Sequence, residues 1–252
     1  MSMRNTLRGV HRGIHVTVVA GLLSIVGGLV YYELRGTDRP YSQAAPHDVV
    51  PSLSKMFDYK PTLLVVGDSY ADTYPDVVAD KMGWSLALDV QDGTGFVNCL
   101  DVADHHVQYI DPPPPRVPFI DRLGRDAATH HADYVLVDGG RTDLWEPPET
   151  VVAAADEFIK TVHSDWPSAK IVILLPAFAT TDQAANYDAV AQGLRVTAES
   201  VGAYVIDPVA QGWYRDVDAR SLQKDRIHLN NDGEIYYARK VVENLNQMGS
   251  TS

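Results

Sequence analysis

The sequence predicts an α/β protein of three layers, in which a doubly wound, five-stranded parallel sheet carries helices on both faces. Short apolar runs alternate along the chain with longer segments of helical character, a pattern typical of β-α units. Glycine and aspartate end the first and the third apolar run abruptly, as they do where a strand passes into a turn. With right-handed crossovers, we expect a single domain with the strand order 2-1-3-4-5.

Each strand is expected at one of these apolar runs. The first run is Leu-Leu-Val-Val and stops at Gly67, and the third is Tyr-Val-Leu-Val and stops shortly before a pair of glycines. The expected strands are residues 63–66, 86–90, 134–137, 171–175 and 204–206. The expected helices are residues 76–82, 119–130, 149–164, 184–201 and 232–247.

One connection in this pattern is irregular. Residues 111–118 read Asp-Pro-Pro-Pro-Pro-Arg-Val-Pro and lie between the second strand and the next helix. Four consecutive prolines favour a stiff, extended polyproline conformation. The segment is therefore interpreted as a rigid surface loop, with a wall or lid over a site as the alternative.

The composition narrows the class of function. The 252 residues are 45% hydrophobic, which is enough for one sizeable core or two small ones. The formal net charge of -12 argues against a nucleic-acid partner, because phosphate contacts need a basic surface. Cys99 is the single cysteine, so no internal disulfide forms.

No cofactor or metal is expected. The sequence shows no phosphate-binding loop, dinucleotide fingerprint or set of metal ligands. The histidine pairs at 105–106 and 130–131 lack the Cys or carboxylate spacing that a metal site needs.

The N-terminal region differs from the rest of the chain. Residues 14–32 contain no Asp, Glu, Lys or Arg, and about 20 apolar residues are needed to cross a bilayer as a helix. Arg4, Arg8 and Arg12 precede this run, so the positive-inside rule places the N-terminus in the cytoplasm. The pattern predicts an uncleaved membrane anchor, with a buried core helix as a less favoured reading.

The anchor hypothesis divides the chain into three parts. Residues 1–35 are the cytoplasmic N-terminus and transmembrane anchor, residues 36–60 a linker, and residues 61–248 a domain on the extracytoplasmic side, at the cell envelope. Five of the 21 basic and two of the 33 acidic residues precede residue 40, so the remainder has a net charge of -15. A signal peptide cleaved near residues 42–44 is the alternative and would give a secreted form.

Ser69 is a candidate nucleophile because it follows a strand, at the edge where open α/β sheets keep their active sites. A serine hydroxyl needs a base, usually a histidine that a carboxylate orients. His228 has Asp225 three residues before it, in a short loop ahead of a helix that begins near Asn231 or Asp232. Ordinary turn and helix-cap chemistry is the alternative for both segments.

The loop after the third strand supports the chemical interpretation. Residues 139–143 read Gly-Gly-Arg-Thr-Asp. Loops after the first and third strands of such a sheet are neighbours, so this loop and Ser69 are expected to flank one crevice. A simple glycine turn does not explain Arg141, Thr142 and Asp143 at the top of the sheet.

Four motifs together resemble the GDSL/SGNH hydrolase superfamily. They are Gly-Asp-Ser at 67–69, Gln-Asp-Gly-Thr-Gly-Phe-Val-Asn at 91–98, the Gly-Gly-Arg-Thr-Asp loop, and Asp-Arg-Ile-His at 225–228. Each motif is weak alone, but they occur in the family's order over about residues 60–248. The resemblance implies a flavodoxin-like sheet and a carboxylic ester hydrolase without a cofactor.

The resemblance also implies roles for individual residues. Ser69 is the expected nucleophile, His228 the general base and then acid, and Asp225 the residue that orients His228. The expected oxyanion donors are the backbone N–H groups of Ser69 and Gly93, with Gly95 as an alternative to Gly93, and the side chain of Thr142.

Thr142 departs from the family, which has asparagine there. A threonine hydroxyl donates one hydrogen bond and is shorter than an amide. This predicts a slow enzyme, a shifted loop, or Arg141 as the substitute donor. Leu229 stands where the family usually has proline, which affects loop rigidity more than chemistry.

Three other functions are alternatives to a serine esterase. The first is an α/β-hydrolase with a Gly-x-Ser-x-Gly elbow, which the closeness of Asp225 and His228 disfavours. The second is an O-acyltransferase that uses the same serine, histidine and aspartate. The third is a catalytically weak binding protein with the same fold, which the Thr142 departure alone supports.

The substrate is expected to be an acylated glycan or a lipid that carries a short acyl or O-acetyl ester. Tyr70, Arg141, Trp145 and Trp213 are candidates for lining its pocket. Phe96 is interpreted as core, because aromatic side chains dominate core burial. The sequence makes no prediction of the oligomeric state.

Overall fold

The computed structural model describes residues 59–100 and 115–250. The chain divides into two units, residues 1–56 and 57–252, and every described residue belongs to the second. Several features predicted from the sequence lie outside the described residues. They are the anchor, the linker up to residue 58, His105, His106 and the first three of the four prolines at 112–115. Over the described ranges, none of the helices combines the length and the apolar character needed to cross a bilayer.

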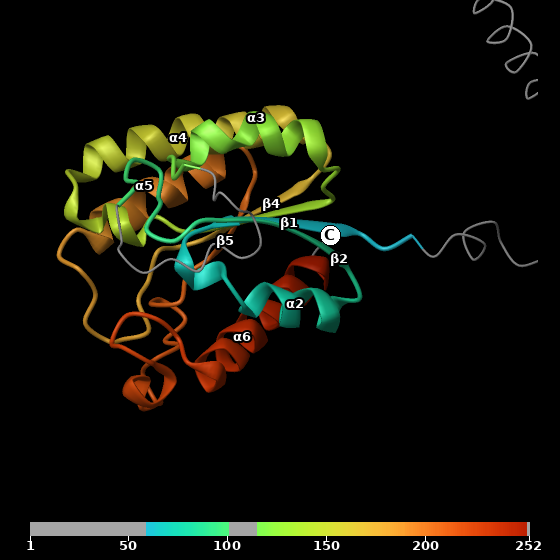
Figure 1. Ribbon diagram of the computed structural model, residues 1–252. Coiled ribbons are helices and arrows are strands. Elements are labelled where there is room, and N and C mark those ends of the chain that lie inside the picture. The colour runs from blue at the N-terminus through green and yellow to red at the C-terminus, as the bar shows by residue number, and fades with distance from the viewer. Residues whose placement is uncertain (1–58, 101–114, 251–252) are drawn as a thin grey trace, which may run out of the picture. The chain divides into compact units, whose positions relative to one another are not determined.

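A five-stranded parallel sheet in the order β2-β1-β3-β4-β5 forms the centre of the fold, which confirms the expected topology (Figure 1). Every neighbouring pair is parallel. The strands are β1 (Thr62–Gly67), β2 (Ser85–Val90), β3 (Tyr134–Asp138), β4 (Lys170–Leu174) and β5 (Tyr204–Ile206). The five expected strands are therefore confirmed to within a residue at either end.

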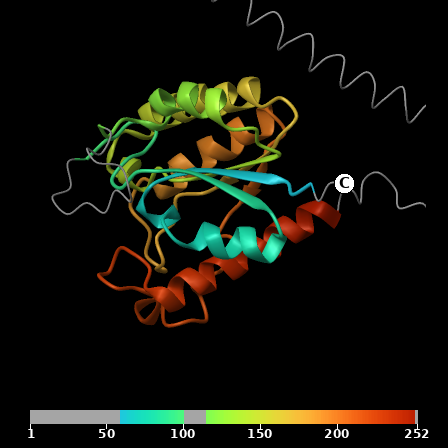
Figure 2. The same cartoon turned by 45° about the vertical axis from the view of Figure 1, so that its right-hand side comes forward.

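Helices cover both faces of this sheet, as expected for three layers. One face carries α3 (Phe119–Thr129), α4 (Pro148–Asp165) and α5 (Tyr187–Ser200), and the other carries α2 (Tyr74–Met82) and α6 (Asn231–Ser250). The turned view in Figure 2 shows the same separation into layers.

Two helices begin more than one residue away from the expected position. Helix α2 begins two residues early, because Pro75 suits the first helical turn, where its missing N–H is no loss. Helix α5 begins at Tyr187 rather than at 184. The side chain of Gln183 bonds the backbone of Phe178 and Thr180, which holds the preceding residues in a loop.

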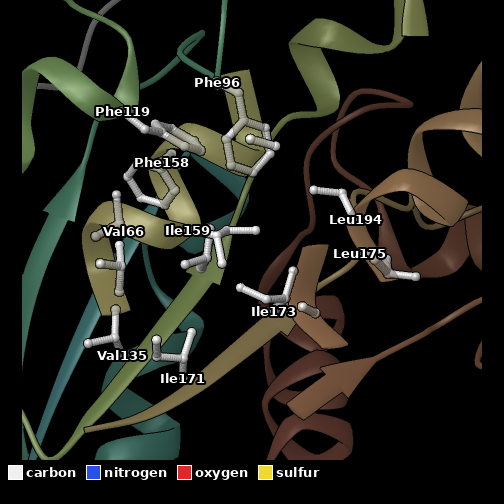
Figure 3. Close-up of a cluster of buried hydrophobic side chains, with 14 of the residues drawn as sticks. Val66, Phe96, Phe119, Val135, Phe158, Ile159, Ile171, Ile173, Leu175 and Leu194 are labelled. Atoms are coloured by element: carbon white, nitrogen blue, oxygen red, sulfur yellow. The ribbon is translucent and has the colours of Figure 1, made fainter. Parts of the chain in front are cut away.

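Two hydrophobic clusters lie on the two faces of the sheet. Successive strand residues alternate between them: Ile171 and Ile173 of β4 join the cluster beneath α3, α4 and α5, whereas Val172 joins the cluster beneath α2 and α6. Figure 3 shows the first cluster, in which Phe96 packs with Phe119 and Phe158. The burial of Phe96 confirms its interpretation as a core residue.

The sheet register brings the first and third loops together. Gly67 at the end of β1 pairs with Asp138 at the end of β3. A Cβ on Gly67 would lie 2.6 Å from the carbonyl oxygen of Asp138, so only glycine permits this approach. The nucleophile turn and the loop that begins at residue 139 therefore leave the sheet side by side.

Candidate active site

The turn that carries Ser69 is a short 3-10 helix, η2 (Ser69–Ala71), at the carboxyl end of β1. Asp68 is its N-cap, and Asp68 Oδ1 accepts a hydrogen bond of 2.9 Å from the backbone N–H of Tyr70. Asp68 therefore has a structural role, because this contact stabilises the turn. The cap holds Ser69 as the first helical residue, at the edge of the sheet.

The structure brings Ser69, His228 and Asp225 into one hydrogen-bonded chain. His228 Nε2 lies 3.0 Å from Ser69 Oγ, and His228 Nδ1 lies 2.7 Å from Asp225 Oδ2. An ionised carboxylate only accepts hydrogen bonds, so the imidazole proton lies on Nδ1. The lone pair of Nε2 then faces the serine hydroxyl, which is the geometry that a general base requires.

Asp225 is held as an anion by its own loop. Burial acts to raise its pKa, but hydrogen bonds from the His228 side chain and from the backbone N–H groups of His228 and Ile227 outweigh burial and lower the pKa to about 2. Its Oδ1 accepts these backbone bonds at 2.7 Å and 3.0 Å. The geometry needs Arg226 at a φ of 74°, a left-handed conformation that is uncommon for a residue with a side chain.

Tyr70 connects the serine turn to the histidine loop. Its hydroxyl donates to the carbonyl oxygen of Ile227 at 2.5 Å and accepts the N–H of Ala179 at 3.2 Å. Burial raises the pKa of Tyr70 to about 12, so the hydroxyl stays protonated and keeps this donor role. Sequence reasoning placed Tyr70 at the site as a lining residue but did not foresee this bridge.

Two backbone N–H groups are available near Ser69 Oγ. Among the described residues, no hydrogen bond engages the N–H of Ser69 or that of Gly93, and both residues border the same cavity. The φ of 70° at Gly93 suits glycine. Gly95 does not serve as the alternative, because its N–H already donates to the carbonyl of Asn98 at 2.8 Å.

The side chain of Thr142 borders the same cavity, but its hydroxyl faces another partner. Thr142 Oγ1 donates to the carbonyl oxygen of Thr94 at 3.2 Å. A hydroxyl has a single proton to donate, so the group is occupied in this arrangement. The third expected oxyanion donor is thus in place but directed elsewhere.

Arg141 is a buried structural cation rather than a free donor. Its Nη2 lies 2.8 Å from Asp138 Oδ1, its Nη1 lies 3.3 Å from Asp68 Oδ1, and its Nε donates to the carbonyl of Ala177. Burial acts to lower its pKa, but the negative charges of Asp138 and Asp68 help to raise it well above the ordinary value. Although Arg141 borders the cavity, its guanidinium is engaged below the nucleophile turn, which corrects its interpretation as a substitute oxyanion donor.

Asp143 holds the turn at residues 96–98, which follows Gly93, in place. No role was assigned to this residue from the sequence. Its carboxylate accepts the backbone N–H groups of Phe96, Asn98 and Val97 at 2.7, 2.8 and 3.4 Å. Burial raises the pKa of Asp143 to about 6 against the lowering effect of these three donors. The only available signal was the position of this acid in the third motif.

An apolar cavity of about 690 Å³ opens beside Ser69 and His228. Trp145, Phe178 and Ile227 contribute apolar walls, and Tyr70 borders it as expected. Trp145 is 68% exposed, so it presents its ring at the surface of the molecule. Tyr70 and Trp145, both predicted to line the substrate pocket, border this cavity.

Trp213 does not line this cavity, and its expected role was wrong. Its ring is buried against Tyr237 in the cluster beneath α6, and its Nε1 donates to Gln211 Oε1. The sequence alone does not distinguish a core aromatic residue from a pocket aromatic residue near the last motif. In the structure, Trp213 belongs to the core.

A second cavity, of about 560 Å³, also borders Ser69 and His228. Its walls are polar and come from the residues just before α2, from the segment that leads into α6 and from the first turn of α6. Its side chains include Asp72, Thr73, Lys224, Asn231, Asp232 and Glu234. No motif in the sequence indicates this cavity.

Within residues 59–100 and 115–250, no group of three or more His, Cys, Asp or Glu side chains is arranged to hold a metal ion. The histidine pair at residues 130–131 is among the described residues. His131 Nε2 lies 3.6 Å from Asp133 Oδ1, and the His131 side chain is largely exposed.

The fold is that of the SGNH hydrolases, and the site has a Ser-His-Asp chain at the carboxyl edge of its sheet. No family model matches the chain. A 110-residue stretch is 26% identical to a protein named GDSL lipase from Mycobacterium tuberculosis, covering 42% of this chain and 47% of that protein. The match thus spans about half the length of this curated relative.

Two solved structures illustrate the shared fold. A lipase/acylhydrolase from Enterococcus faecalis has a TM-score of 0.55 and 14% identity, over 73% of this chain and 94% of its own. An acetylxylan esterase from Geobacillus stearothermophilus also has a TM-score of 0.55, with 15% identity over 73% of this chain and 93% of its own.

Proposed function

We propose that the protein is a serine esterase that hydrolyses a carboxylic ester through an acyl-enzyme on Ser69. The observation that carries the proposal is the pair of hydrogen bonds from His228, 3.0 Å to Ser69 Oγ and 2.7 Å to Asp225 Oδ2. Neutral imidazole next to a serine hydroxyl, with a carboxylate behind it, is the arrangement that activates a serine nucleophile.

The proposed reaction follows from these positions. Ser69 Oγ attacks the ester carbonyl while His228 Nε2 takes its proton, and the N–H groups of Ser69 and Gly93 donate to the oxyanion. The tetrahedral intermediate collapses, and His228 returns the proton to the leaving alcohol. Water then attacks the acyl-enzyme with His228 again as base, which releases the acid and restores Ser69.

The comparisons support an ester substrate. The curated relative is a GDSL lipase, and proteins with the same fold include an acetylxylan esterase. We propose a short-chain acyl or O-acetyl ester of a glycan or a lipid as the substrate class.

The test is turnover of 4-nitrophenyl acetate and labelling by a fluorophosphonate probe. Both are expected for the full chain and lost in Ser69→Ala, whereas Ser164→Ala, at an exposed serine of α4, is the matched control. Absence of both signals in folded protein would refute the esterase. Labelling without turnover would instead support acyl transfer or a defective oxyanion site.

We also propose that the domain is tethered to a membrane by residues 1–35. The support is the uncharged run at 14–32 and the arginines before it. The full chain is expected in the membrane fraction, released by detergent but not by salt. Recovery of the intact chain in the soluble fraction would refute the tether.

A further inference from the structure

The polar cavity lies against the same two side chains as the apolar one. Ser69 and His228 border both, whereas the other residues of the two cavities differ. The proposed nucleophile therefore stands where two chemically unlike spaces meet. An ester has two unlike halves, an acyl group and an alcohol, and the bond between them breaks at the carbonyl carbon that Ser69 Oγ attacks.

The positions of the oxyanion donors decide which half enters which cavity. Gly93, whose N–H is open to the oxyanion, borders the apolar cavity only, so the carbonyl oxygen is directed to that side. The leaving alcohol must lie within reach of His228, which protonates it, and on the side away from the acyl group. The polar cavity meets this requirement, because it borders His228 but neither Gly93 nor Thr142.

The side chains of the polar cavity suit an alcohol rich in hydroxyl groups. In the described part of the chain, no protein group forms a hydrogen bond with the side chains of Thr73, Asn231 or Asp232. They are therefore open to a ligand. Asn230, by contrast, is occupied, because its amide bonds the backbone of Ser221 and Gln223.

The charge of this cavity disfavours an anionic alcohol. Asp72, Asp232 and Glu234 supply three carboxyl groups against the single ammonium group of Lys224. Burial raises the pKa of Glu234 to about 7, so at pH 8 most of this group is charged and the acids outnumber the cation. A phosphate on the alcohol would meet this excess negative charge at short range.

We propose that the polar cavity is the subsite for the alcohol half of the ester and that it selects a neutral, polyhydroxylated alcohol over a phosphorylated one. This inference rests on the esterase function proposed above. It goes beyond that function because it separates neutral glycan or glycerol esters from phospholipid-like esters.

The experiment compares two esters that differ by one phosphate, 1-butanoylglycerol and 1-butanoylglycerol 3-phosphate, with the full chain at pH 8 and low salt. We expect kcat/KM to be about tenfold higher for the neutral ester, with the ratio shrinking as salt screens the charges. Equal values, or a preference for the phosphate ester through Lys224, would overturn the proposal.

Two variants locate the selectivity. Asp232→Asn removes one charge from the cavity and is expected to lower the ratio by about threefold. Asp188→Asn is the matched control, since Asp188 lies in the first turn of α5 as Asp232 does in α6, but borders neither cavity. An unchanged ratio in Asp232→Asn, or an equal fall in Asp188→Asn, would contradict the assignment.

Turnover of a simple ester distinguishes failure of the alcohol subsite from failure of the esterase function. Turnover of 4-nitrophenyl butanoate that disappears in Ser69→Ala, together with equal rates for the two glycerol esters, would leave the esterase standing and refute the subsite. Absence of turnover on every ester would refute both.

Discussion

Replacing Thr142 by asparagine is expected to raise kcat for ester hydrolysis by about tenfold. The Thr142 hydroxyl has one proton, and the carbonyl oxygen of Thr94 takes it at 3.2 Å. An asparagine amide has two N–H groups, so it can keep a bond to Thr94 and still direct a donor into the cavity.

The size of the gain follows from what an oxyanion donor is worth. Loss of one such donor costs about 2.7–4 kcal/mol of transition-state stabilisation, or 10²–10³ in rate. We expect the asparagine to recover about half of that free energy, because the surrounding loop is shaped for threonine. Since the interaction exists only in the transition state, kcat should rise while KM changes little.

The assay is steady-state hydrolysis of 4-nitrophenyl butanoate by the wild type, Thr142→Asn and Thr142→Val. Valine has the shape of threonine without the hydroxyl. If that hydroxyl is committed to Thr94, kcat of the valine variant should fall by less than about threefold. A hundredfold loss would show that Thr142 already serves the oxyanion, and an unchanged or lower kcat in folded Thr142→Asn would refute the missing amide.

Three further substitutions test the site and its support. Tyr70→Phe is expected to lower the free energy of unfolding by about 1–3 kcal/mol, because it leaves the buried N–H of Ala179 unpaired. It should also lower kcat, because the loop that carries His228 loses its hydrogen bond to Tyr70. Trp145→Ala should lower kcat/KM for 4-nitrophenyl octanoate about fivefold more than for the acetate, with stability changed by less than about 0.5 kcal/mol at this exposed position. Burial raises the pKa of Asp126 to about 7, above its value in the unfolded chain. The unfolded chain therefore releases this proton first, and the wild type loses stability as pH rises from about 4 to 7. Asp126→Asn should be more stable than the wild type by about 1–2 kcal/mol at pH 8.

Each of these expectations has a result that would contradict it. Unchanged stability and kcat in Tyr70→Phe would show that the bridge is dispensable. Equal losses on both esters in Trp145→Ala would remove the ring from the acyl-binding wall. A pH-independent stability difference in Asp126→Asn, measured by urea denaturation beside the exposed Asp121→Asn, would contradict the buried, raised acid.

The strands and the triad could be predicted because their signals are local. The four apolar residues before Gly67 are buried completely in β1, and short runs of this kind have few other uses. Asp225 and His228 are three residues apart, so their contact depends on one loop. The pairing of either residue with Ser69 followed only from the family's order of motifs.

The contacts that shape the site could not be predicted, because they join distant residues. The role of Asp143 depends on a turn 45 residues earlier, whose N–H groups it accepts. The orientation of the Thr142 hydroxyl depends on a carbonyl that lies near only after folding. Trp213 failed as a pocket residue for the same reason, since α6 covers it.

The acid and the base of the proposed triad belong to one short turn, while the serine comes from the opposite end of the domain. Asp225 and His228 are joined within that turn, but the bond to Ser69 spans 159 residues of chain. A local opening of the turn would carry acid and base away together with their mutual bond intact. Partial unfolding of this turn would then inactivate the protein by separating the intact Asp225–His228 pair from Ser69. Activity would return when the turn closes, because the pair would not have to form again.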